Sequence, residues 1–284
     1  MAKEKVNVFI GSGEASLLER KTLIYSLRKH TLRDLDIYVF NGTHNAIELN
    51  DGDPFLAPLP LHLKYKNRIT EFSLYRFLIP QLCGYQGRAI YLDSDMVCLK
   101  DIGELFDTEM GGYDFLAKAE AYPEENRAVW GLSVILFDCE KCKFNLETIF
   151  KEIDEKKYSY FEFTRMSPNF LSIHPFKVGP LLAQWNSFDY WDNTTNLIHY
   201  TELDTQPWKY RDHPYGELWF EYFHEAMEAG YLSQDDVSLS IRRAYVRRDI
   251  LLGNSTGEIL IKKTKSQVIQ QLRELKRRLV LSRF

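Results

Sequence analysis

Apolar residues along the first half of the chain fall into short runs and helical stripes, and their spacing predicts alternating strands and helices. Val6 to Ile10 and Ile37 to Phe40 are short apolar runs of the kind that form buried strands. Between them, residues 16–30 carry an apolar stripe at helical spacing, made of Leu17, Leu23, Ile24 and Leu27. This order is typical of the βαβ units that build doubly wound α/β sheets.

The same reading extends the pattern through the rest of the chain. It predicts helices at 70–81, 143–156, 216–229 and 235–245, and strands at 89–92, 115–117 and 133–137. Residues 158–230 are rich in aromatic residues and prolines. We expect this segment to cover a substrate rather than to form a layered core.

Two aspartates follow the apolar run Ala89–Leu92. Asp93 and Asp95 are two residues apart, so both carboxylates can face one side of the strand end. Two neighbouring carboxylates repel each other unless a cation lies between them. Oxygen ligands at such a sheet edge suit Mg²⁺ or Mn²⁺ holding a phosphate ester. A turn that merely uses Asp and Ser as turn formers would leave the same sequence pattern.

The composition describes an ordinary globular protein. The 284 residues are 45% hydrophobic and 27% charged, which excludes disorder, and no apolar run approaches the length of a membrane span. The amino terminus runs directly into a strand without an apolar signal segment, so we expect a cytoplasmic protein. The pair Cys139 and Cys142 lacks the second pair that a zinc site would need, and the four cysteines do not form a disulfide framework.

The charge is divided unevenly along the chain. Residues 262–284 contain eight Lys or Arg and one Glu, a charge of +7, which leaves −11 for the first 261 residues of a chain with net charge −4. The acidic body argues against nucleic-acid binding. We therefore divide the chain into a domain at 1–258 and a basic amphipathic helix at 259–284. The helix is expected either to touch the anionic inner face of a membrane peripherally, or to pack on the domain or another subunit.

Three further segments, in order around the aspartates, resemble glycosyltransferase family 8. They are Glu71–Pro80, Gly131–Asp138 and His199–Trp208. The family is a retaining group that includes glycogenin and bacterial lipopolysaccharide galactosyl- and glucosyltransferases, and the resemblance covers Val6 to Trp208. It implies a GT-A fold: a Rossmann-like, mostly parallel sheet flanked by helices, with an aromatic-rich acceptor-side region and a C-terminal helical tail.

The resemblance also assigns roles to residues. It implies that Mn²⁺ or Mg²⁺ binds Asp93, Asp95 and His199; His199 emerges from the apolar pair Leu197-Ile198, and a mixed nitrogen and oxygen set suits either ion. It implies that the nucleotide-sugar contacts Ile10, Gly11, Ser12, Glu14, Arg76, Asp93, Ser94 and Asp95. Gln206 and Lys209 are further candidates for this contact.

The chain departs from the family pattern at two places. Gln206 stands where members usually carry a lysine that meets the diphosphate, so Lys209 or Arg211 is expected to supply that charge. The Asp-Gln pair that lies against the transferred sugar is replaced by a stretch without a carboxylate, Arg165–Phe170. The remaining candidates for catalytic contacts with the sugar are Asn169, Gln184 and Asn186.

The resulting hypothesis is metal-dependent transfer of a hexose from UDP-glucose or UDP-galactose to a glycan, lipid or other hydroxyl acceptor, with retention. Trp185, Tyr190 or Trp191 is expected to serve either as a stacking platform for the acceptor or as an ordinary core residue. Two alternatives stay open. One is a haloacid dehalogenase-type phosphatase, with Gln234–Asp236 as its second acidic cluster. The other is a non-catalytic protein of the same fold that binds a sugar-nucleotide or a glycan.

Overall fold

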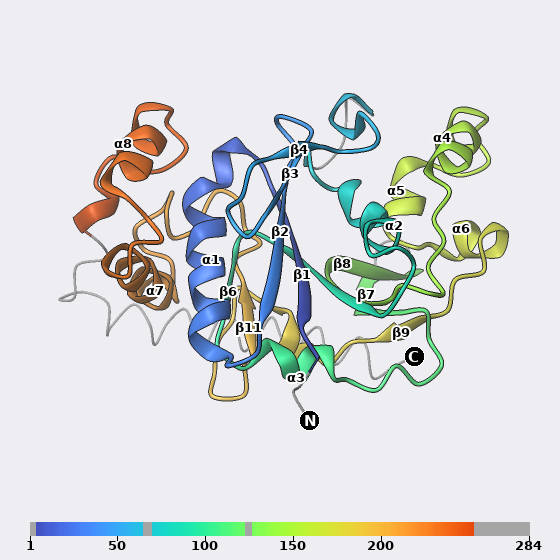
Figure 1. Ribbon diagram of the computed structural model, residues 1–284, viewed down its shortest axis with the longest axis horizontal. Coiled ribbons are helices and arrows are strands. Elements are labelled where there is room, and N and C mark those ends of the chain that lie inside the picture. Colours follow the sequence, from blue (N-terminus) through green and yellow to red (C-terminus); the bar gives the residue numbers. More distant parts are fainter. Residues whose placement is uncertain (1–3, 65–69, 123–126, 253–284) are drawn as a thin grey trace.

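A computed structural model describes residues 4–64, 70–122 and 127–252, and within them an eight-stranded sheet forms the centre of the molecule (Figure 1). Its strand order is β4-β3-β2-β1-β5-β8-β7-β9. The strands are β1 (Val6–Ser12), β2 (Leu35–Asn41), β3 (Ala46–Leu49), β4 (Phe55–Leu56), β5 (Arg88–Asp93), β7 (Phe115–Tyr122), β8 (Arg127–Asp138) and β9 (Val178–Pro180). A second sheet has the order β10-β11-β6, formed by β10 (Ser187–Phe188), β11 (Leu197–His199) and β6 (Met96–Cys98).

The large sheet is mixed, with both parallel and antiparallel strand pairs. β1 runs parallel to both β2 and β5, and β9 runs parallel to β7. The pairs β2–β3, β3–β4, β5–β8 and β7–β8 are antiparallel. The predicted α/β class is confirmed. The sheet is less parallel than expected. The β2–β3 connection, for example, is too short to hold a crossover helix, so these two strands pair antiparallel.

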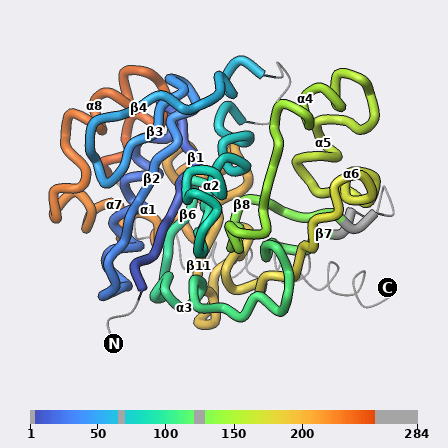
Figure 2. The backbone as a smooth tube through the Cα atoms, turned by 45° about the vertical axis from the view of Figure 1, so that its right-hand side comes forward, coloured from blue at the N-terminus to red at the C-terminus, as the bar shows by residue number. Residues whose placement is uncertain are grey.

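Helices cover both faces of the sheet. α1 (Leu17–His30), α7 (Gly216–Glu228) and α8 (Gln234–Arg242) gather on one side, and α2 (Ile79–Leu82), α4 (Leu146–Asp154), α5 (Tyr160–Thr164) and α6 (Pro168–Ile173) on the other (Figures 1 and 2). α3 (Ile102–Phe106) follows the second sheet's β6. Short 3-10 turns are η1 (Glu14–Ser16), η2 (Leu61–Leu63), η3 (Tyr75–Leu78), η4 (Ala183–Trp185) and η5 (Ile250–Leu252). None of the helices in the described ranges combines the length and the apolar character that a membrane span requires.

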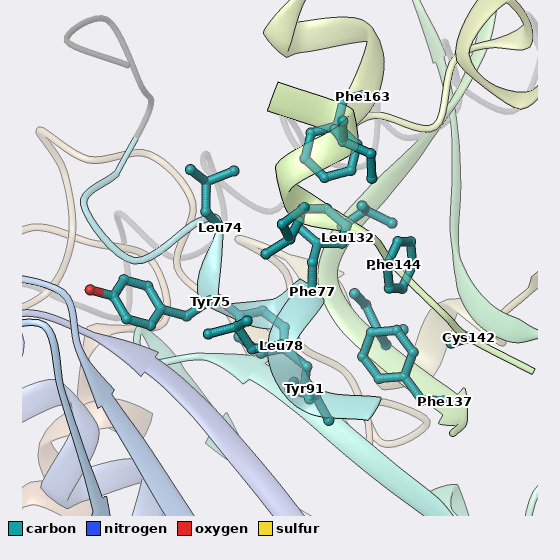
Figure 3. Packing of buried hydrophobic residues seen from close by; sticks show 14 of the residues in the cluster. Leu74, Tyr75, Phe77, Leu78, Tyr91, Leu132, Phe137, Cys142, Phe144 and Phe163 are labelled. Carbon is teal, nitrogen blue, oxygen red and sulfur yellow. The ribbon is translucent and has the colours of Figure 1, made fainter. Parts of the chain in front are cut away.

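Strand β1 shows how the sequence builds this core. Val6, Val8 and Ile10 alternate along the strand and pack in the cluster that contains Leu23, Ile24 and Leu27 of α1. Phe9 points to the opposite face, into the cluster that contains Tyr91. Figure 3 shows part of this second cluster, including Tyr91, Leu132, Phe77 and Leu78.

Two expectations about the elements need correction. The helix predicted at 70–81 is reduced to η3 and the four-residue α2, because Pro80 near the start of α2 cannot donate the hydrogen bond of a continuous helix. The aromatic segment at 158–230 is not only a cover. Its Tyr200, Trp208 and Trp219 are fully buried and form a third core cluster with α7 and Leu18 of α1.

Candidate metal centre

The turn between β5 and β6 brings Asp93 and Asp95 next to His199. β5 ends at Asp93, and β6 pairs antiparallel with β11 so that His199 lies opposite Met96. Nε2 of His199 is 2.9 Å from Oδ1 of Asp95. One ligand atom from each of the three side chains lies within 4.8 Å of the others. The structure therefore assembles residues that are about a hundred positions apart in sequence.

The donor set fits a divalent cation. Two ligands at right angles around an ion at about 2.1 Å lie about 3 Å apart, which matches the contact between His199 and Asp95. Two carboxylates and an imidazole suit Mn²⁺ or Mg²⁺ rather than a thiolate-seeking ion. The site can hold such an ion and leave further positions of its shell to a phosphate.

Asp93 is the more enclosed of the two carboxylates. Oδ1 accepts a hydrogen bond from the Tyr91 hydroxyl at 2.6 Å and one from Nη2 of Arg76 at 3.3 Å. Burial raises the pKa of Asp93, and the Arg76 charge opposes part of that rise. Without a bound cation, Arg76 is thus the nearest compensating charge for this carboxylate.

Arg76 is a buried arginine held by backbone as well as by charge. Nε donates to Ser73 O at 2.8 Å, and Nη1 donates to Leu132 O. Its guanidinium lies 4.6 Å from the centre of the Tyr91 ring. Burial alone would lower the pKa of Arg76, but Tyr91 and Asp93 outweigh it and the pKa is raised. Arg76 is therefore a fixed positive charge beside the aspartates.

Asp95 and His199 are held by two amides. Nε2 of Gln206 donates to Oδ2 of Asp95 at 3.1 Å and to Tyr200 O at 2.9 Å. Nδ1 of His199 lies 3.1 Å from Oδ1 of Asn186. Burial lowers the pKa of His199, but the Asp95 carboxylate outweighs it and the net pKa is raised. Gln206, predicted at the diphosphate, thus contacts a metal ligand.

The turn after β1 adjoins the aspartates, since Gly11 pairs with Asp93 in the sheet. A Cβ on Gly11 would lie 2.1 Å from the Tyr91 hydroxyl, so only glycine leaves room for the Tyr91–Asp93 contact. Ser12 is fully buried and donates to Gly13 O. Glu14, predicted to bind the nucleoside, forms an ion pair with Arg243 just after α8.

Other predicted residues lie apart from this hydrogen-bond network. Ile10 points into the core. Asn169 donates to Lys157 O and to Glu162, both near α5, and Gln184 is exposed. Ser94 is buried between the aspartates, and exposed Lys209 donates to Leu203 O at 3.1 Å.

The aromatic residues predicted as a platform for the acceptor differ in exposure. Trp185 is a core residue at 3% exposure and cannot serve as a platform, whereas Trp191 is 41% exposed.

Sequence reasoning missed three polar residues of β5 and β7. Tyr91 was read only as part of an apolar run. Lys118 of β7 donates to Asn186 O at 2.8 Å, and its ammonium lies 3.3 Å from the centre of the Phe188 ring. The Glu120 carboxylate covers Gly131, where a Cβ would come within 2.1 Å of it. Lys118 and Glu120 alternate with apolar residues just beyond the strand predicted at 115–117. This alternation could have shown that the strand continues and carries polar side chains.

Comparisons with known proteins agree with this geometry. Residues 17–243 match the sequence model of glycosyl transferase family 8. A stretch of 174 residues is 30% identical to Protein CDI of Arabidopsis thaliana, covering 55% of this chain and 65% of that relative. The alignment thus spans slightly less than two thirds of the relative's length.

Solved glycosyltransferases share the fold. The galactosyltransferase LgtC, in complex with donor and acceptor sugar analogs, superimposes with a TM-score of 0.58 at 13% identity, over 80% of this chain and all of that one. WbbM, a bifunctional glycosyltransferase, gives 0.54 at 15% identity, over 80% of this chain and 52% of that one. GlyE of Streptococcus pneumoniae gives 0.54 at 18% identity, over 86% and 65%. The GT-A arrangement is therefore confirmed.

Proposed function

Because the chain belongs to glycosyltransferase family 8, we propose that it transfers a hexose from UDP-glucose or UDP-galactose to a hydroxyl group of a glycan or lipid-linked acceptor, with retention at the anomeric carbon. The cluster of Asp93, Asp95 and His199 at the end of the central strands carries the proposal. Family membership makes the protein a glycosyltransferase, which removes the phosphatase alternative.

The charges around the cluster suit a sugar diphosphate. A Mn²⁺ or Mg²⁺ ion held by Asp93, Asp95 and His199 would neutralise charge on the leaving diphosphate. Arg76 keeps Asp93 in place and adds a fixed positive charge. Lys209 is exposed close to Gln206 in sequence, so it takes the phosphate-binding role that Gln206 cannot perform.

A transferred sugar needs polar groups that can bond its hydroxyls. Lys118 and Glu120 lie on one face of β7, and Lys118 reaches the backbone of Asn186 beside His199. Glu120 supplies a carboxylate in a chain that lacks the family's Asp-Gln pair. We assign Glu120 the hydrogen bonds to sugar hydroxyls that this pair makes elsewhere in the family.

A donor screen tests the proposal. UDP-, GDP- and dTDP-sugars are each incubated with Mn²⁺, Mg²⁺ or EDTA, using wild type, Asp95→Ala and Asp154→Ala. Asp154 is an exposed aspartate at the end of α4 and serves as the control. We expect metal-dependent release of UDP from one UDP-sugar, abolished by Asp95→Ala and by EDTA but unchanged in Asp154→Ala.

The other outcomes are equally informative. Tight donor binding without turnover, with or without added acceptor sugars, would support the non-catalytic alternative. Turnover that survives EDTA would contradict the metal role. Absence of both binding and turnover for every donor would overturn the proposed substrate class.

The basic segment 259–284 lies outside the described residues, and its charge alone suggests an acceptor on an anionic surface. We expect the full chain to bind phosphatidylglycerol vesicles at low salt and to dissociate as salt rises. A chain ending at residue 258 should lose this binding. Equal binding by both forms would contradict a membrane role for the segment.

A further inference from the structure

His199 is held at both ring nitrogens. Nε2 faces Asp95 at 2.9 Å, and Nδ1 faces the side-chain oxygen of Asn186 at 3.1 Å. An amide oxygen only accepts hydrogen bonds, so the proton in this contact lies on Nδ1. His199 therefore directs Nε2 toward the two carboxylates, which is the orientation that a metal ligand needs.

Asn186 is itself fixed from three directions. It is fully buried, and Nδ2 donates to Ser133 Oγ at 2.9 Å. Its backbone oxygen accepts from Lys118 at 2.8 Å, and its backbone N–H donates to Ala183 O at 3.1 Å. A buried amide with both ends of its side chain bonded has one usable orientation.

Ser133 belongs to an irregularity in strand β8. The β7–β8 register passes from Ala117 opposite Ile135 to Lys118 opposite Gly131, so Leu132, Ser133 and Val134 have no partners on β7. Such bulges redirect side chains and backbone groups beside functional sites. Here Leu132 O accepts from Arg76, while the Ser133 hydroxyl accepts from Asn186.

These contacts form a closed path around the cluster. From Asp93 it runs through Arg76 to Leu132 O, along the backbone to Ser133, then through Asn186 and His199 to Asp95. Asp93 and Asp95 close it within one turn. Both arms of the cluster thus rest on two adjacent residues of β8, Leu132 and Ser133.

We propose that Asn186 and Ser133 are positioning residues that join His199 to Arg76 through the β8 bulge, so that the metal-binding and donor-binding sides of the site are set together. The inference rests on the proposed metal-dependent function. It changes the role of Asn186 from the predicted contact with the sugar to the orientation of a metal ligand.

Mn²⁺ binding, followed by electron paramagnetic resonance without any donor, tests the first part. Asn186→Leu removes both hydrogen bonds at similar volume and should weaken Mn²⁺ binding by about 10- to 100-fold. Asn186→Asp keeps an acceptor for Nδ1–H and should bind at least as tightly as wild type. Ser133→Ala should weaken binding several-fold, whereas Ser240→Ala, which removes a buried hydroxyl from α8, should leave it unchanged.

A double-mutant comparison tests the link to Arg76. No hydrogen bond joins Arg76 and Asn186 directly among the described contacts, so independent sites would give multiplicative losses of Mn²⁺ affinity. If the bulge joins them, Arg76→Lys combined with Asn186→Leu should lose clearly less than the product of the single losses. A loss equal to that product would overturn the link.

The outcomes separate this inference from the proposed function. Wild type that does not bind Mn²⁺ would overturn the proposed metal dependence and the inference with it. Wild type that binds, together with a folded Asn186→Leu that binds equally well, would overturn the inference alone. If circular dichroism shows that Asn186→Leu does not fold, unchanged binding in Ser133→Ala would overturn it instead.

Discussion

At the scale of single residues, burial sets the charge of a carboxyl group on α1. Glu19 is 4% exposed, and its Oε2 has no hydrogen-bond partner within the described structure. Burial raises the pKa of Glu19 from 4.5 to about 8. The folded protein therefore keeps a proton on Glu19 at pH values where the unfolded chain has released it.

This difference makes stability depend on pH. The protonated Glu19 contributes fully below pH 4.5, and its contribution is lost as pH rises toward 8. Wild type should lose about 1.4 kcal/mol per pH unit relative to Glu19→Gln within that window. Urea unfolding of both proteins at pH 5, 6.5 and 8 measures it. Parallel stability curves would show that Glu19 does not titrate in the folded state as inferred.

The four thiols should differ sharply in reactivity. A hydrogen bond from Cys139 lowers the pKa of Cys83, the cysteine with the greatest exposure. Burial raises the pKa of Cys98 to about 12 and raises that of Cys142 as well, while the bond to Cys83 and burial raise that of Cys139. Iodoacetamide at pH 8 should therefore alkylate Cys83 first, as peptide mass spectrometry would show. Earlier labelling of Cys139 would contradict this order.

At the scale of elements, two of the helices begin with a complete capping box. Ser159 of α5 and Ser233 of α8 each accept from a backbone N–H, and the acid three residues later accepts in return. Ser16 precedes α1 without making a side-chain cap bond. Ser233→Ala should lower the free energy of unfolding by about 1 kcal/mol, and Ser16→Ala by much less. Equal losses in urea titrations would refute the distinction.

The central strands of the large sheet were predictable from sequence because their signal is local. The apolar runs at Val6 and Ala89 correspond to β1 and β5, and the helix at 16–30 corresponds to η1 and α1. The structure of segment 70–81 was not predicted correctly. Its apolar spacing is helical, but Pro80 interrupts the backbone hydrogen bonds of a continuous helix. The spacing of apolar residues shows which face of an element is buried, but it does not show where the element's backbone hydrogen bonds end.

Part of the candidate site could be predicted from the sequence and part could not. The motif and the resemblance predicted Asp93, Asp95 and His199, and the structure places these residues together. The role of Asn186 depends on a bulge whose register is set by distant strand pairing, so no local pattern encodes it. The contact of Tyr91 with Asp93 could not be predicted, because a tyrosine in an apolar run looks like a core residue. Only the structure shows that its hydroxyl donates to Asp93.

At the scale of the whole molecule, salt bridges tie together the helices on one side of the large sheet. Lys21 pairs with Asp236 and Lys29 with Glu225, which fasten α1 to α8 and α7. The pair between Glu14 and Arg243 fastens the end of α8 to the β1 turn. Ligand binding at the turn is thus expected to stabilise the molecule as a unit.

Thermal unfolding with and without UDP and Mn²⁺ checks this expectation. At ligand concentrations about 100-fold above Kd, binding adds about 2.7 kcal/mol, which should raise Tm by roughly 5 °C. Asp95→Ala should abolish the shift, and Asp154→Ala should retain it. A shift of equal size in Asp95→Ala would place the ligand away from the cluster.

The pairing of β6 with β11 has a consequence for the nascent chain. Residues 96–98 find their partners only at 197–199, so the two aspartates leave the ribosome about a hundred residues before the histidine. At about 5–20 residues per second, this delay lasts roughly 5–20 seconds. During that interval the aspartates lack their imidazole neighbour, and the emerging chain has no complete cation site. A cation that bound this cluster could therefore be captured only late in biosynthesis, after the central strands can already have paired.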